Sequence, residues 1–316
     1  MKHLYFCACT EDGGIYHYTF ENGNVSFCEK VDVDKPMYIS IEGNKAYVIL
    51  KETDPETKFG AAMTFDIDSD GKLINPTEPV SSLGIVPCHL SVKNGGVYTV
   101  NYLSGNVVKL PDTVDTHSGK GPHPTRQTEA HTHFVSPTPD GKYILCTDLG
   151  IDSIFTYTSD LEQVSVAKVP DGYGARHLAF SEDGKLVYCV NELVSSVSVF
   201  DYDDGKLTYL NTYDCLPDFK EKNTAAAIRI EGKYLYISNR GAETITRLEI
   251  CGKELRLLEN TYCGGKNPRD FLIVDDLMFC TNEFTNDVTV LRLVDGKPVL
   301  TDLKLDMPNP LCVIVN

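Results

Sequence analysis

Short hydrophobic runs, separated by polar turns, recur along the whole chain at similar intervals. Each copy contains a β-rich run that ends in a polar residue, a turn of four or five residues, and a second β-rich run, as in VYTVNYLSGNVVKL and VYCVNELVSSVSVFDY. Seven copies occur, 42 to 51 residues apart, when seven positions are taken as equivalent: Ala8, Leu50, Asn101, Asp148, Asn191, Asn239 and Asn282. A repeat of about 45 residues that contains only short strands is typical of the blades of a β-propeller.

The two ends of the chain together make one copy of the repeat. A further strand precedes each of the other six hairpins, as in MYISIEGN and HLAFSEDG, but none precedes the first hairpin. The missing strand is found as CVIVN at the C-terminus, where pairing with the N-terminal hairpin would remove an open sheet edge. The sequence therefore predicts a single all-β domain, residues 1–316. This domain is a seven-bladed β-propeller of four-stranded antiparallel blades, with the first blade closed by the C-terminal strand.

The composition predicts an ordinary globular protein of the cytoplasm. Of 316 residues, 42% are hydrophobic, enough to bury a core without disulfides or metal. The eleven cysteines are odd in number and mostly single within apolar runs, without a CxxC pair or a zinc-ligand spacing, so we expect reduced thiols. The N-terminal apolar stretch is too short for a signal peptide, and no window approaches the ~18 apolar residues of a spanning helix.

The charge balance narrows the possible partners. The net charge is −16 and there is no basic run, which argues against nucleic acid or an anionic membrane as a partner. An anionic ligand must therefore bind at a local positive site, and the chain has only eight arginines to build one. We expect a small anionic ligand. The sequence leaves a monomer and a homodimer both open.

Polar residues at equivalent positions of a propeller converge at one rim of its central channel. Three lie in one register of the innermost strands, with Cys88 and Met37 in the same register elsewhere: His133, Arg176 and Arg269. Three more come from the turn after the second strand: Asp148, Glu192 and Arg240. Arginine binds carboxylate or phosphate bidentately and can stabilise an oxyanion, and a histidine or glutamate beside cations can move a proton.

Structural roles compete with functional ones at several of these positions. An Asn or Asp after a strand often caps its own turn, so we expect structural roles for Asp148 and for the asparagines at the equivalent positions. Glu192 could serve only as the ion-pair partner of Arg176. In GPHPTRQTEAHTHF, which also holds His123, a metal site at His131 and His133 lacks supporting carboxylates in register, so we expect no metal.

Four stretches resemble the seven-bladed lactonase family, which includes propeller-type 6-phosphogluconolactonases of bacteria and carboxy-muconate lactonising enzymes of fungi. They are GPHPTRQTEAHTHFVSPTPDGKYILCTDLGIDSIFTY, GARHLAFSEDGKLVYCVNEL, AAAIRIEGKYLYISNRG and GGKNPRDF, and they cover most of residues 120–290 in the family's order and spacing. The chain departs from the family at Ala130–His133, which usually reads Pro-His-Ala-His. The resemblance implies a metal-independent site, without a cofactor, on one face of the propeller.

The resemblance also implies roles for individual residues. The active-site His, Arg and Glu of the family match the catalytic candidates His133, Arg176 and Glu192. The substrate-binding candidates are Arg240 in the NRG motif, Arg269 in the PRDF stretch, His131 and His177. The implied reaction is hydrolysis of a sugar lactone, 6-phosphogluconolactone to 6-phosphogluconate of the pentose phosphate pathway, with His133 or Glu192 as the base. A lactonising cycloisomerase and a non-catalytic binding propeller remain as alternatives.

Overall fold

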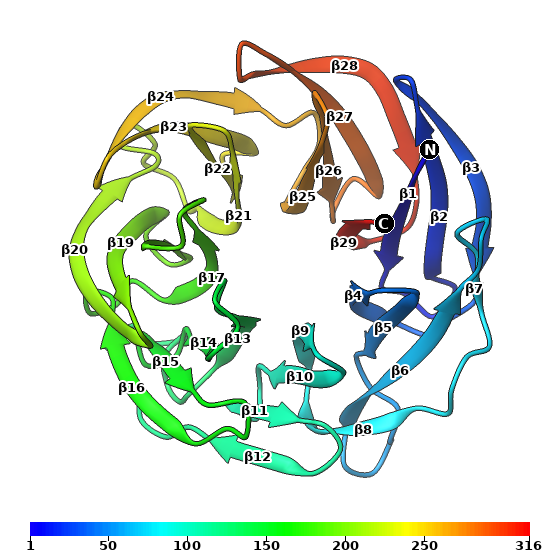
Figure 1. Ribbon diagram of the computed structural model, residues 1–316. Helices are drawn as coiled ribbons and strands as arrows, with labels where there is room; N and C mark the ends of the chain where they lie inside the picture. Colours follow the sequence, from blue (N-terminus) through cyan, green and yellow to red (C-terminus); the bar gives the residue numbers. More distant parts are fainter.

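The protein is a ring of seven β-sheet blades around a central channel (Figure 1). The computed structural model describes all residues from 1 to 316, and every regular element in it is a strand. No helix long and apolar enough to cross a membrane is therefore found. Each blade is an antiparallel sheet whose first strand lines the channel and whose last strand lies at the periphery. The predicted seven-bladed all-β fold is confirmed.

The strands are as follows, from the channel outwards. Blade 1 contains β29 (Pro310–Val315), β1 (Lys2–Ala8), β2 (Gly14–Glu21) and β3 (Asn24–Val31). Blade 2 contains β4 (Pro36–Glu42), β5 (Lys45–Leu50), β6 (Phe59–Ile67), β7 (Leu73–Ile74) and β8 (Val80–Ile85). Blade 3 contains β9 (Pro87–Lys93), β10 (Gly96–Asn101), β11 (Asn106–Lys109) and β12 (Thr113–Thr116). Blade 4 contains β13 (Thr132–Pro137), β14 (Ile144–Asp148), β15 (Ser153–Tyr157) and β16 (Gln163–Lys168). Blade 5 contains β17 (Ala175–Phe180), β18 (Leu186–Asn191), β19 (Ser196–Asp203) and β20 (Lys206–Asp214). Blade 6 contains β21 (Thr224–Glu231), β22 (Tyr234–Arg240), β23 (Thr244–Cys251) and β24 (Glu254–Tyr262). Blade 7 contains β25 (Pro268–Val274), β26 (Leu277–Asn282), β27 (Asp287–Val294) and β28 (Lys297–Asp306).

Blade 1 closes the ring by combining the two ends of the chain. Strand β29 pairs antiparallel with β1, with Leu4 opposite Val315 and Cys7 opposite Cys312. Two backbone hydrogen bonds between His3 and Asn316, of 3.0 and 2.9 Å, extend this pairing to the last residue. Both ends lie beside each other in Figure 1, as the sequence predicts.

Blade 2 departs from the regular four-stranded pattern. Its outer edge is divided between the two-residue strand β7 and the longer β8, and both pair with β6. The extra segment explains why the interval from Leu50 to Asn101 is the longest of the repeat intervals in the chain.

The hydrophobic core lies mainly in the seams between blades rather than in one central mass. Between blades 1 and 7, for example, Phe6 packs edge-on against Phe279 with ring centroids 6.4 Å apart, within a cluster that includes Val288. The channel itself is lined by the inner strands.

We call the end of the channel at which these strands begin the upper mouth and the other end the lower mouth.

A tyrosine on the second strand of several blades connects that blade to the next one. Three such hydroxyls donate to a turn carbonyl of the next blade: Tyr5 to Gly71 at 2.5 Å, Tyr98 to Ser159 at 2.8 Å and Tyr236 to Gly296 at 2.6 Å. Tyr188 of blade 5 occupies the same position and is fully buried, yet its hydroxyl has no protein partner. The corresponding turn of blade 6, at Gly252, instead lines a hollow of about 1080 Å³ on the lower face.

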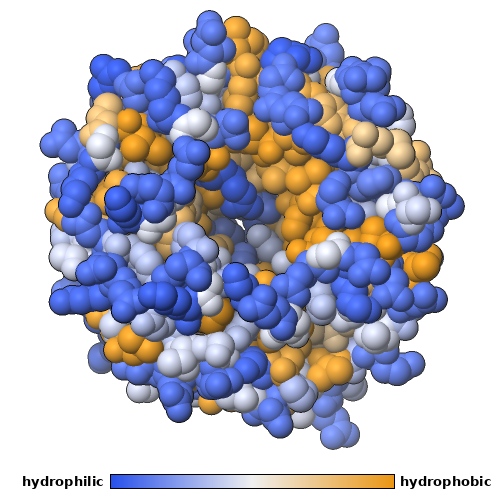
Figure 2. Space-filling model, viewed as in Figure 1, coloured by the Kyte–Doolittle hydropathy of each residue, from blue (hydrophilic) through white to orange (hydrophobic).

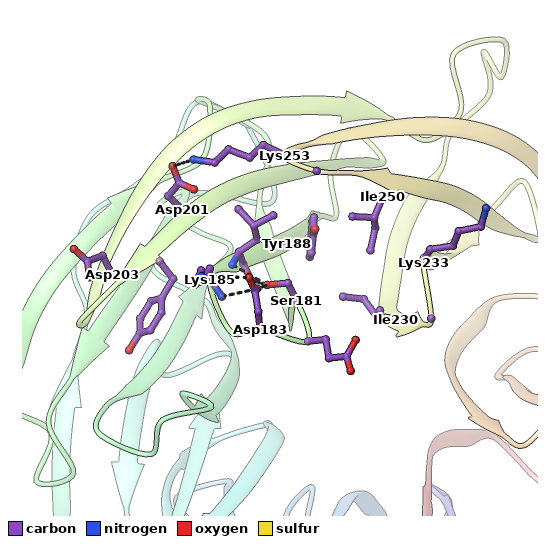
Figure 3. A pocket seen from close by; sticks show the side chains of 15 residues that line it. Ser181, Asp183, Lys185, Tyr188, Asp201, Asp203, Ile230, Lys233, Ile250 and Lys253 are labelled. Atoms are coloured by element: carbon purple, nitrogen blue, oxygen red, sulfur yellow. Dashed lines mark hydrogen bonds and ion pairs between the residues drawn. The ribbon is translucent and has the colours of Figure 1, made fainter.

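Figure 3 shows Tyr188 in this hollow, close to Ile230 and Ile250, with the ion pair of Lys253 and Asp201 to one side. Lys233, which also lines the hollow, pairs with Glu249 at 2.8 Å. None of the predicted site residues lines this hollow, so it is distinct from the upper mouth.

Removal of the hydroxyl group should change stability differently at Tyr236 and at Tyr188. Tyr236→Phe should lower the free energy of unfolding by about 1 kcal/mol, because it leaves the carbonyl of Gly296 without its donor. Tyr188→Phe should leave stability unchanged or raise it, since no protein hydrogen bond is lost. Urea denaturation of both variants measures the difference, and equal losses would contradict it.

Candidate active site

Every inner strand contains one extra residue near the upper mouth. In all seven blades the register with the second strand shifts at this point. In six blades one residue has no partner across the ladder, and in blade 6 two residues, Ala226 and Ala227, lie opposite Ser238. The bulge includes Met37, Cys88, His133, Arg176, Ala226, Arg269 and Leu311. A bulge re-aims a side chain, and five of these residues line one small internal cavity. The register that the sequence analysis identified is thus a ring of bulges around the channel.

Glu192 lies at the centre of the candidate site. It follows β18 directly, its side chain is 3% exposed, and three arginines contact its carboxylate. Arg126 Nη2 lies 2.5 Å from Oε1, while Arg176 Nε and Arg240 Nη2 each lie 2.9 Å from Oε2. His133 Nε2 is 4.0 Å from the same Oε2. The structure therefore brings three predicted site residues, His133, Arg176 and Arg240, to the buried carboxylate of a fourth, Glu192.

The ionisation of the site follows from burial and crowded positive charge. Burial raises the pKa of Glu192, but the surrounding guanidiniums, that of Arg240 first, outweigh it and hold the pKa well below its ordinary value. Burial and then the charge of Arg176 hold the pKa of His133 well below 6.5. Burial, with the charge of Arg240, also lowers the pKa of Arg176 to about 9. At neutral pH the site thus contains an ionised Glu192 beside an uncharged imidazole.

Two atoms of the site lack protein partners although they are buried. They are Nη1 of Arg176 and Nδ1 of His133. A buried guanidinium nitrogen without an acceptor is costly, so its position favours an oxygen atom of a ligand. One guanidinium nitrogen and one imidazole nitrogen of the site are therefore without a protein partner.

Arg269 lies on the same rim but does not contact Glu192. Its Nη1 is 3.4 Å from Glu283, and its side chain is 24% exposed. It is close enough that its charge lowers the pKa values of both Arg176 and His133. The predicted substrate-binding candidate Arg269 is thus at the mouth, paired with a carboxylate of its own blade.

The other predicted residues lie away from the Glu192 carboxylate. His131 stacks on Tyr102, with ring centroids 4.4 Å apart, and its Nδ1 is 2.9 Å from the Tyr102 carbonyl. His177 lies deeper in the channel against His89 and Phe134. Substrate contact by His131 and His177 stays a prediction.

The residues for which structural roles were expected make hydrogen bonds within their turns, and Asp148 also binds the segment that precedes β13. Asp148 accepts hydrogen bonds from the backbone of His131 and Gly150, and pairs with His117 at 2.7 Å. Asn282 donates to Asp287 in its turn at 2.8 Å, and the other turn asparagines make comparable contacts. These contacts hold the turns that carry the site residues.

Sequence reasoning missed Arg126 and Tyr102. Arg126 donates to both Glu192 and the Tyr102 hydroxyl, the latter at 3.2 Å. Tyr102 immediately follows Asn101, as Glu192 follows Asn191 and Arg240 follows Asn239. Reading one position beyond each equivalent residue would have found Tyr102, and also Glu283. Arg126 lies in a loop, for which no repeat position exists.

No group of three or more His, Cys, Asp or Glu residues is arranged to hold a metal ion. All eleven cysteines are free thiols; nine are buried, and Cys28 and Cys251 are exposed. Burial raises the pKa of Cys88, the thiol beside the site, to about 12. The polar groups at the upper mouth are thus arginine, histidine and carboxylate.

Figure 2 shows the opening of the central channel on one face of the ring. Hydrophilic side chains lie inside this opening, and hydrophobic side chains lie around part of its rim. The fold and the site together define a β-propeller whose channel holds a buried carboxylate in contact with three arginines. Residues 3–315 match the family of seven-bladed β-propeller lactonases. The chain belongs to this family.

Similar proteins agree with this assignment. An uncharacterized protein of Staphylococcus epidermidis is 32% identical over 332 residues, covering 96% of each chain. A protein of Bacteroides fragilis, named provisionally as a 6-phosphogluconolactonase, is 26% identical with a TM-score of 0.90 over 100% of this chain and 98% of its own. The periplasmic gluconolactonase PpgL of Pseudomonas aeruginosa has the same fold, with a TM-score of 0.89 over 99% of this chain and 98% of its own, and 24% identity.

Proposed function

We propose that the protein hydrolyses a sugar lactone, 6-phosphogluconolactone being the substrate that fits best. The observation that carries this proposal is the set of three guanidiniums and an uncharged imidazole around Glu192. Such a set can bind an anion, stabilise an oxyanion and accept a proton within one site. Membership of the lactonase family and the name given to the Bacteroides fragilis protein support this substrate class.

The proposed mechanism assigns one task to each group. His133 takes a proton from water as the water oxygen attacks the lactone carbonyl. The unpaired Nη1 of Arg176 donates to the carbonyl oxygen, which gains negative charge in the tetrahedral intermediate. The ring C–O bond then breaks, and protonated His133 returns its proton to the ring oxygen. The products are a carboxylic acid and an alcohol.

Glu192 acts as a positioning residue in this mechanism. Its low pKa makes it a weak base, and both of its oxygens are already occupied by guanidinium groups. It fixes Arg176 and Arg240 beside the imidazole instead. Of the two candidate bases, the geometry therefore favours His133.

The remaining parts of the proposal rest on composition. A net charge of −16 favours a small-molecule substrate over nucleic acid, and the many free thiols favour the cytoplasm. The positive charge at the site comes from arginine, so the proposed hydrolysis is metal-independent.

A lactonase assay tests the proposal directly. Lactones hydrolyse in water without enzyme, so the rate with purified protein is compared with the rate in buffer alone, on 6-phosphogluconolactone and on unphosphorylated gluconolactone. We expect a rate that rises in proportion to protein concentration and does not change after treatment with EDTA. A rate equal to that of buffer would contradict lactonase activity. Loss of activity with EDTA, restored by added metal, would contradict metal independence.

Ring closure of a carboxy-muconate is the alternative reaction, and the same preparation tests it. Consumption of that dicarboxylate in place of either sugar lactone would reassign the site to a lactonising enzyme. If none of the three compounds is turned over, the non-catalytic binding propeller is the alternative that stands.

A further inference from the structure

The three arginines that contact Glu192 differ in their freedom to change partners. The side chain of Arg126 is 36% exposed, whereas those of Arg176 and Arg240 are 2% and 10% exposed. Arg240 also donates to the carbonyl of Ala225 at 2.9 Å. Arg176 is enclosed in the channel. Arg126 is thus the one member of the set that can turn from Glu192 to a ligand.

Only one guanidinium nitrogen of Arg126 makes hydrogen bonds to the protein. Nη2 makes both side-chain contacts, to Glu192 and to the Tyr102 hydroxyl. The other two nitrogens, Nη1 and Nε, make no hydrogen bond to the protein. A guanidinium binds phosphate with two parallel N–H groups, and on arginine these are the pairs Nη1–Nη2 and Nε–Nη2. Arg126 can therefore bind phosphate bidentately when Nη2 turns from Glu192 to the ligand, because the second donor, Nη1 or Nε, is already free.

The backbone that carries Arg126 is firmly held. Residues 117–131, which we call the strap, connect β12 to β13 beside the upper mouth. At one end His117 pairs with Asp148 at 2.7 Å. Near the other end the fully buried amide of Gln127 donates to Asp152 at 2.7 Å, and also to the carbonyl of Leu149. The strap therefore presents the side chain at a fixed place and leaves its end free to move.

The charge balance of the site favours an additional anion. Glu192 supplies one negative charge against the three guanidiniums in contact with it. Arg269 adds a further positive charge, which its ion pair with Glu283 partly offsets. The lowered pKa of Arg176 reflects this crowding as well as its burial. A dianionic group placed beside Arg126 would offset the excess.

We propose that Arg126 binds the phosphate group of the substrate and thereby sets the preference for a phosphorylated over a neutral lactone. This inference rests on the proposed function, since it names the substrate class of the same site. Nη2 of Arg126, turned from Glu192, and the adjacent Nη1 bind two phosphate oxygens at the upper mouth. The lactone carbonyl meanwhile lies deeper, beside Arg176 and His133.

The test compares two substrates that differ only in the phosphate. In Arg126→Gln, KM should rise on 6-phosphogluconolactone by a factor at least about tenfold larger than the factor by which it changes on gluconolactone. Arg126→Lys should restore the KM only in part, because it keeps the charge but loses the planar fork. The matched control is Arg292→Gln, which removes a surface arginine paired with Asp276. This variant should keep the wild-type KM for both lactones.

Two kinetic outcomes would overturn the proposal. Equal losses on both lactones would show that Arg126 acts only through Glu192 and does not read the phosphate. Unchanged kinetics on both would show that it has no role in recognition.

A binding measurement separates this inference from lactonase activity itself. The product 6-phosphogluconate should raise the Tm of the wild-type protein, and Arg126→Gln should remove most of that rise. If wild type hydrolyses neither lactone but shows this pattern, the proposed function fails and the anion-binding role of Arg126 stands. A Tm rise that persists in Arg126→Gln, or no rise in wild type, overturns the role of Arg126 whatever the activity.

Discussion

Glu192→Gln is expected to destabilise the protein by about 3–5 kcal/mol and to remove nearly all activity. Glutamine has almost the same shape, but it takes away the only negative charge in contact with three guanidiniums. Arg176 is enclosed and cannot turn towards water. The free energy of unfolding from urea denaturation and the turnover number measure the two effects.

The loss of stability in Glu192→Gln should depend on pH. The pKa of Glu192 is lowered in the folded protein, from an ordinary value of 4.5, so its contribution to stability is present above pH 4.5. That contribution disappears as the pH falls through the folded-state pKa. The wild type and the variant should therefore differ most near neutral pH and converge in acid, provided that the fold still withstands it.

Glu249→Gln is the matched control for this experiment. Glu249 also contacts two cations, Lys233 and Arg256, but it does so at the surface. Solvent screens exposed ion pairs, so this change should have little effect on stability at any pH. Equal effects of the two substitutions, or a Glu192→Gln variant as stable and active as wild type, would contradict the central role of Glu192.

The fold could be predicted because a propeller repeats one short pattern. Seven hairpins at regular intervals, with a missing inner strand found at the C-terminus, leave little choice but a closed ring. The divided outer edge of blade 2 could not be predicted in the same way. Strand β7 has only two residues and carries no alternation of its own, and β8 follows a turn whose length the repeat does not determine.

The site was predictable where it depends on register and not where it depends on loops. His133, Arg176 and Arg269 share one bulge position, so their convergence follows from the strand pattern. The strap that carries Arg126 has no counterpart in the repeat, and long-range contacts such as those of Gln127 fix its course. His177 follows Arg176 directly and lines the same small cavity, but its ring packs on His89 and Phe134 and makes no contact with Glu192, which adjacency in sequence could not predict.

His133→Asn is expected to lower kcat for lactone hydrolysis by roughly 10²- to 10⁴-fold, with a smaller effect on KM. Asparagine keeps a polar side chain but cannot accept a proton at neutral pH. The imidazole of His133 is uncharged there because burial and the charge of Arg176 lower its pKa. Initial rates on 6-phosphogluconolactone, corrected for hydrolysis in buffer, provide both constants.

The pH profile gives His133 a signature that a structural role would lack. A base must be unprotonated to act, so wild-type kcat/KM should fall towards acid with an apparent pKa below 6.5, and this limb should vanish in His133→Asn. His89→Asn is the matched control: its imidazole is also buried with a lowered pKa, but it lies deeper in the channel against Tyr38 and Phe134. That variant should keep both the turnover and the acidic limb. A His133→Asn enzyme within threefold of wild type, or one that keeps the same acidic limb, would contradict His133 as the base.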